Sequence, residues 1–198
     1  MLPEYFALVS TVVVSLGTLQ YLWLTLRGEV QPNRLTFFFW GLFPLIIYFA
    51  QSSLDVSGVL WITLSVGVLP FAIIVASYVN PSAHWNMLPR DYLLGVMAII
   101  AMVLWYVTDD PLIAIYFALV ADLLAGLPTL IKCYTSPQSE DWRPYALNAF
   151  GFLIGLLSVQ QWVVAEYAFV AYLFLMTALF SLVIVVRQQQ VEQLQDCK

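Results

Sequence analysis

Seven long apolar stretches run through this chain, separated only by short polar segments. Each is close to the length of about 20 residues that a helix needs to cross the hydrocarbon core of a bilayer. Because lipid cannot satisfy exposed backbone groups, apolar stretches of this length predict transmembrane helices. The predicted spans are residues 5–26, 34–53, 57–79, 91–108, 111–134, 144–162 and 164–187.

The distribution of charge predicts how these spans are oriented. Every basic residue lies in or beside the first, third or fifth connection, or after the last span. These residues are Arg27, Arg34, Arg90, Lys132, Arg143, Arg187 and Lys198. The N-terminus and the other connections hold acids instead: Glu4, Asp55, Asp109, Asp110 and Glu166. Since cytosolic loops are rich in Lys and Arg, we expect the N-terminus outside and the C-terminus in the cytosol.

Composition supports a multi-pass integral membrane protein and argues against other classes. Apolar residues make up 62% of the chain and charged residues 10%, and seven helices leave no room for a soluble domain among 198 residues. A net charge of −5 without a basic patch gives no indication of nucleic-acid binding. We expect the plasma membrane or an inner membrane as the location, with the lipid bilayer as a partner.

Motifs of enzymes, metal sites and cofactor sites are not found in the sequence. It holds no HExxH motif, no pair of membrane aspartates, no CxxC cluster and no phosphate-binding glycine loop. A retinal photoreceptor would need a lysine in the last span, and residues 164–186 contain none. We therefore expect no enzymatic activity, no cofactor and no metal.

An imperfect internal repeat divides the chain. The first and fifth spans, with the loop and helix that follow each, align without a gap at an offset of 108 residues. This alignment sets Trp40 opposite Asn148 and the polar loop 28–33 opposite 136–141. Four spans separate the copies, so both have the same orientation, as in parallel-repeat transporters with a site at the repeat interface.

The expected organisation is three helices, one connecting helix and three helices. The first repeat covers residues 1–80, a linker with the fourth helix covers 81–110, the second repeat covers 111–190, and 191–198 form a short cytosolic tail. Residues 93–104 are apolar on every face, which predicts that the fourth helix lies at the periphery against lipid.

This topology, together with the segment from Asp122 to Lys132 around Pro128, resembles the PQ-loop superfamily, which includes the SWEET sugar transporters. In that superfamily a Pro-Gln dipeptide marks the first and fifth helices, and its prolines act as hinges. Here Pro128 is followed by Thr129, and Leu19 precedes Gln20. The resemblance implies a transporter with its substrate between the repeats. It makes Trp40 and Asn148 candidates for the Trp and Asn that hold the solute, although both are expected nearer the cytosolic third than the midplane.

Asp122 is the one ionisable residue predicted near the middle of a span. A charged carboxylate at that depth costs about 3 kcal/mol on insertion scales, so such residues usually face the bundle interior and mark a substrate or ion path. A carboxyl that exchanges a proton in the membrane is also the requirement for proton coupling. The alternative is a protonated Asp122 that forms a structural hydrogen bond between helices.

Three prolines, Pro44, Pro70 and Pro128, lie inside predicted spans. A proline removes one helical hydrogen bond and kinks the helix, which makes Pro128 and Pro44 candidate hinges. The alternative is a purely structural role, since membrane helices tolerate proline well.

Two functions from different classes remain open. The first is a secondary transporter that moves a small polar solute, with protons as candidate coupling ions, between the two repeats. The second is a non-transporting membrane sensor or an accessory or assembly subunit. Homo-oligomerisation is left open by the sequence, and so is the identity of the solute.

Overall fold

A computed structural model describes residues 2–56, 58–83, 85–107 and 110–196 of the chain. These residues form seven α-helices and one short 3-10 helix, and none of them lies in a β-strand. The elements are α1 (Phe6–Arg27), α2 (Arg34–Ser53), α3 (Leu60–Val79), α4 (Pro89–Tyr106), α5 (Pro111–Thr135), η1 (Pro137–Ser139), α6 (Trp142–Leu157) and α7 (Val164–Asp196).

Polar side chains and one glycine set the helix ends. The side-chain oxygen of Asn33 accepts hydrogen bonds from two backbone N–H groups at the start of α2, and Asp110 does the same for α5. Asp141 accepts one backbone N–H at the start of α6. Such caps satisfy N–H groups that have no partner within the helix. Gly28 ends α1 with a φ of 75°, a conformation that glycine adopts without steric cost.

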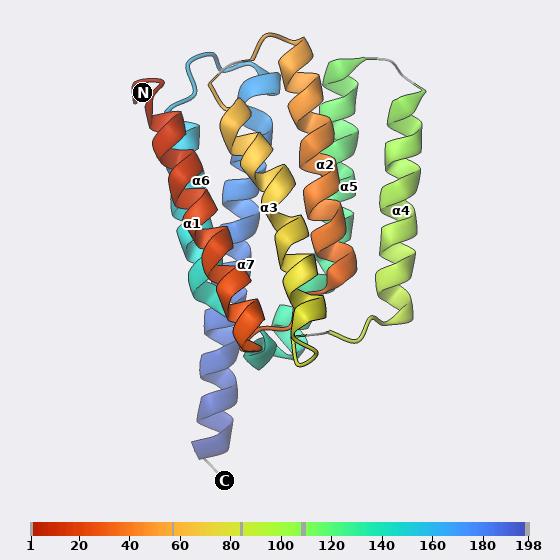
Figure 1. Ribbon diagram of the computed structural model, residues 1–198, viewed down its shortest axis with the longest axis vertical. Coiled ribbons are helices and arrows are strands. Elements are labelled where there is room, and N and C mark those ends of the chain that lie inside the picture. The colour runs from red at the N-terminus through yellow and green to blue at the C-terminus, as the bar shows by residue number, and fades with distance from the viewer. Residues whose placement is uncertain (1, 57, 84, 108–109, 197–198) are drawn as a thin grey trace.

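Figure 1 shows the helices side by side in one bundle, with the N-terminus at one end and the C-terminus at the other. The third helix packs against both α1 and α2, and α7 packs against both α5 and α6. These two groups meet through α1 on α6 and α2 on α5. At the edge of the bundle, α4 packs mainly on α5.

Five helices are long and apolar enough to cross a membrane: α1, α2, α3, α5 and α7. The chain is therefore an all-helical, multi-pass membrane protein. Among the described residues, α4 has only a short apolar part, Asp91–Ile100, and α6 has only 16 residues.

The last two helices differ most from their predicted bounds. The sixth span was expected to reach residue 162, but α6 ends at Leu157. The following loop is held by Glu166, whose carboxylate accepts the N–H groups of Gln160 at 3.1 Å and Gln161 at 3.0 Å. In contrast, α7 continues to Asp196 and projects beyond the other helices, because its glutamine-rich end has good helix propensity.

The interior consists of two groups of buried apolar side chains. One includes Phe43, Ile62 and Phe169, nearer the end of the bundle that holds the N-terminus. The other includes Phe37 and Phe180, nearer the end from which α7 projects. Members of both groups line one cavity, which therefore lies between them.

Candidate functional site

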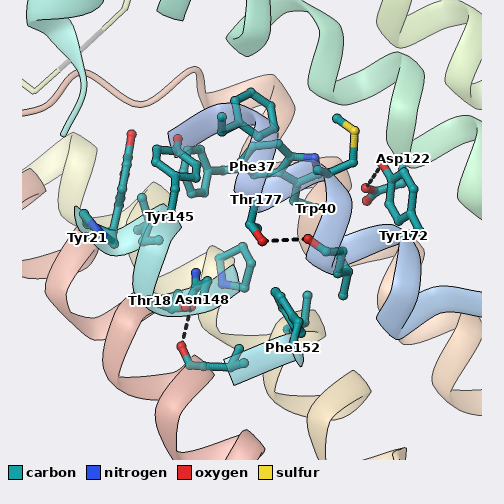
Figure 2. Close-up of a pocket in the computed structure, with 18 residues that line it drawn as sticks. Thr18, Tyr21, Phe37, Trp40, Asp122, Tyr145, Asn148, Phe152, Tyr172 and Thr177 are labelled. Atoms are coloured by element: carbon teal, nitrogen blue, oxygen red, sulfur yellow. Dashed lines mark hydrogen bonds between the residues drawn. The ribbon is translucent and has the colours of Figure 1, made fainter. Parts of the chain in front are cut away.

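A cavity of about 80 Å³ lies inside the bundle. All six helices other than α4 contribute to its wall, most of which is apolar or aromatic. Figure 2 shows the lining side chains. They are Val14, Thr18, Tyr21, Phe37, Trp40, Val66, Pro70, Ile73, Asp122, Pro144, Tyr145, Asn148, Phe152, Tyr172, Leu173, Met176, Thr177 and Phe180. The sequence-predicted residues Asp122, Asn148 and Trp40 thus line one cavity.

Asp122 lies on α5 and is only 2% exposed. Its Oδ2 accepts a hydrogen bond of 2.8 Å from the hydroxyl of Tyr172 on α7 (Figure 2). Within the described ranges, no Lys or Arg forms an ion pair with this carboxylate. Among the described residues of the helices that pack on α5, only Tyr172 of α7 brings a titratable group to Asp122. Sequence reasoning missed Tyr172, because the pairing depends on how α5 and α7 pack.

Asn148 lies on α6, where its amide faces α1. Its Nδ2 donates a long hydrogen bond of 3.5 Å to the hydroxyl of Thr18. Its Oδ1 is buried and has no hydrogen-bond partner among the described residues. The amide fits there because Gly17 has no side chain, since a Cβ at that position would overlap Oδ1.

Trp40 lies on α2 among other aromatic rings. Its ring meets Phe37 and Phe180 edge-on, with centroid distances of 5.2 Å and 5.5 Å. The indole also lies beside Gly126 of α5, where an added Cβ would be 3.4 Å from the ring. Trp40 of α2 therefore packs against Gly126 of α5, and Asn148 of α6 packs against Gly17 of α1.

Two tyrosines close the cavity toward the end of the bundle from which α7 projects. Tyr21 and Tyr145 line the cavity, and both hydroxyls donate to the carboxylate of Glu140, at 3.0 Å and 3.2 Å. Glu140 is itself only 3% exposed. The carboxylate thus holds α1 and α6 together beneath the cavity.

A buried ion pair completes this closure. The ammonium group of Lys132 pairs with Glu140 and also donates to the backbone carbonyl of Gln31. Neither charged side chain is exposed at all. The expectation that Lys132 is a basic residue flanking a cytosolic loop is therefore incomplete: the residue lies inside the protein. The sequence signal was a lysine and a glutamate on either side of one short loop.

The arginines that begin α2 and α6 do not take part in this closure. Arg34 donates to the hydroxyl and the carbonyl of Ser77, at 2.8 Å and 2.6 Å. Arg143 pairs with Asp141 at 3.3 Å on the surface. Both therefore lie outside the buried network around Glu140.

The candidate hinges Pro44 and Pro128 are buried inside α2 and α5, and both helices continue through them. Neither ring lines the cavity, whereas Pro70 of α3 does. Because proline lacks an N–H, Pro44 leaves the carbonyl of Trp40 without its helical donor. Next to Pro128, the hydroxyl of Thr129 is buried without a partner among the described residues.

The described part of the chain holds no group of three or more His, Cys, Asp or Glu residues that could bind a metal ion.

Comparison with protein-family models, curated proteins and solved structures finds no match to this chain.

Proposed function

We propose that this protein is a small secondary transporter that moves a small polar solute, coupled to protons, through a site between two three-helix repeats. The observation that supports it most is the composition of the cavity. One buried carboxylate, one amide and one indole line it together, and all six helices of the two proposed repeats enclose it. Ionisable residues within membrane spans commonly mark such substrate or proton paths.

The packing order of the helices supports the repeat. In each proposed repeat, α1–α3 and α5–α7, the third helix lies between the other two. At the offset of 108 residues, Trp40 corresponds to Asn148 and Asn33 to Asp141, and both members of the second pair cap a helix. This arrangement is expected of parallel repeats that pack about an axis along the membrane normal.

One hydrogen bond is especially informative for this symmetry. The N–H of Gln31 donates to the carbonyl of Ser139 at 3.0 Å. These residues correspond to each other at the same offset. In an arrangement of two equivalent units, equivalent residues meet only at the symmetry axis. The pair therefore supports an axis that passes through the α1–α2 and α5–α6 loops.

A secondary transporter needs a site that opens to one side at a time. The layer of Tyr21, Tyr145 and Glu140 closes the cavity on the proposed cytosolic side. Toward the opposite end, Gln51 donates to the carbonyl of Ala165 at 2.8 Å and accepts from Thr63 at 2.8 Å. Polar contacts thus join the helices on both sides of the cavity, as an occluded state requires.

The second candidate, an accessory or assembly subunit, is favoured by one feature. The C-terminal end of α7 projects beyond the bundle and carries the exposed Leu194. A partner in the cytosol could bind this segment. Removal of residues 191–198 would weaken that partner's binding and leave solute flux unchanged if transport is the function.

The decisive experiment is reconstitution into proteoliposomes with a panel of amines, sugars, amino acids and vitamins. We expect accumulation of one solute class under an imposed pH gradient. Asp122→Asn should abolish that accumulation because it keeps the size and polarity of the side chain but removes its proton exchange. Gradient-driven uptake by the Asn variant at the wild-type rate would contradict the coupling role, and no flux of any solute would contradict transport.

A further inference from the structure

The hydroxyl groups that line the cavity already donate their protons to acceptors within the protein, so they are not free to donate to a solute. Thr18 and Thr177 donate to carbonyls of their own helices, at 3.1 Å and 2.7 Å. Tyr172 donates to Asp122, and the two tyrosines beneath the cavity donate to Glu140. All five hydroxyl protons are therefore engaged within the protein.

The hydrogen-bond acceptors of Asp122 and Asn148 are only partly satisfied within the protein. Asp122 receives the hydrogen bond from Tyr172 on one oxygen, and no basic residue in the described ranges neutralises the carboxylate. Asn148 also lines the cavity, and its Oδ1 has no hydrogen-bond partner among the described residues. A buried carboxylate without a cation and an unpaired amide oxygen both favour a ligand that brings positive charge and N–H donors.

Aromatic side chains make up a large part of the remaining wall, and the rest of it is aliphatic. Seven aromatic side chains line the cavity: Tyr21, Phe37, Trp40, Tyr145, Phe152, Tyr172 and Phe180. Aromatic faces attract cations through the ring quadrupole, and Trp does so most strongly. Aromatic rings together with one carboxylate can recognise a ligand that carries an ammonium group on a small apolar carbon chain.

We infer that the cavity binds a small organic amine as its ammonium cation, with Asp122 as the counter-ion and Trp40 beside the alkyl-ammonium group. This inference rests on the proposed function, since it names the solute class of the same site. A sugar would need several free hydrogen-bond groups, and the lining hydroxyls are already paired. An anion would meet the Asp122 carboxylate without any basic partner. The volume of about 80 Å³ suits a body of only a few heavy atoms.

The test measures equilibrium binding, which does not require flux. Purified protein in nanodiscs is titrated calorimetrically with butylammonium, butanol and propionate, which have similar size and differ in charge. We expect butylammonium to bind at least about tenfold more tightly than butanol, which corresponds to one charged hydrogen bond, and propionate not to bind. This comparison uses the unaltered chain and does not depend on a variant that folds.

Two substitutions test whether the ammonium group binds at Asp122. Asp122→Asn should weaken butylammonium binding at least about tenfold and leave butanol binding unchanged. The matched control is Glu166→Gln, which makes the same chemical change at a buried acid on α7 that does not line the cavity. Its butylammonium affinity should equal that of the unaltered protein.

Several results would overturn the inference: no butylammonium binding, equal binding of butanol, tighter binding of propionate, or unchanged affinity in Asp122→Asn. Failure of the proposed function is distinguishable from failure of this inference. Butylammonium binding without flux in proteoliposomes contradicts transport alone. Flux of a neutral or anionic solute without butylammonium binding contradicts the amine assignment alone.

Discussion

At the residue scale, the buried ion pair between Lys132 and Glu140 limits which substitutions the protein can tolerate. Burial removes both charges from water, and only their mutual attraction and further hydrogen bonds offset that cost. Glu140 accepts from two tyrosines, and Lys132 donates to a backbone carbonyl, so the polar groups of the pair are well satisfied.

We expect loss of either charge alone to be costly. Lys132→Met should lower the free energy of unfolding by about 3–5 kcal/mol, because the Glu140 carboxylate then stays buried without a cation. The double variant Lys132→Met with Glu140→Gln should recover part of that loss, since it leaves no unpaired charge. Unfolding in detergent mixtures measures both, and a double variant less stable than Lys132→Met would contradict this account.

The close packing of Asn148 against Gly17 gives a second prediction at this scale. Gly17→Ala should destabilise the protein by about 1–3 kcal/mol, because the added methyl group overlaps the amide and approaches the carbonyl of Pro144. The matched control is Gly58→Ala, where the nearest atom lies at an ordinary contact distance of 3.4 Å. Thermal unfolding of the two variants compares them directly, and equal stability would show that α1 and α6 adjust freely.

At the element scale, the sequence predicts most helices well. Apolar length places α1, α2, α3 and α5 within a few residues of their observed bounds, because lipid-facing helices must be apolar along their whole length. The end of α6 could not be predicted in this way, since a hydrogen-bonded loop held by Glu166 replaces its last turn. The partners of Asp122 and Lys132 also depend on helix packing, which hydropathy does not encode.

The proposed hinge belongs to this scale. If α5 bends at Pro128 during alternating access, Pro128→Ala should straighten the helix and slow solute turnover without loss of folding. The matched control is Pro111→Ala in the first turn of the same helix, where a proline removes no helical hydrogen bond. Uptake rates in proteoliposomes measure the effect, and equal rates in the two variants would assign Pro128 a structural role.

At the scale of the whole molecule, the arrangement of charge predicts the orientation in the membrane. The loops with Arg27 and Arg143 and the projecting end of α7 share one end of the bundle, opposite the N-terminus. The positive-inside rule assigns that end to the cytosol.

Cysteine labelling tests this orientation. In a chain with Cys197→Ser, the remaining native thiol, Cys133, is buried and should not react. An impermeant maleimide added to intact cells should label Asp55→Cys, and Glu29→Cys only after the membrane is opened. Labelling of Glu29→Cys from outside would contradict the assigned orientation.

The position of the buried ion pair has a consequence for the proposed transport cycle. Lys132 and Glu140 both belong to the α5–α7 half, so a rocking motion of the two halves would carry the pair along intact. Hydrogen bonds that join the halves toward this end include Tyr21 to Glu140, Lys132 to the Gln31 carbonyl, Gln31 to the Ser139 carbonyl and Thr36 to the Ala125 carbonyl. Each is worth about 0.5–3 kcal/mol, less than the cost of separating two buried charges. If the two halves rock apart in a transport cycle, opening of the cytosolic side would therefore not require separation of the two buried charges.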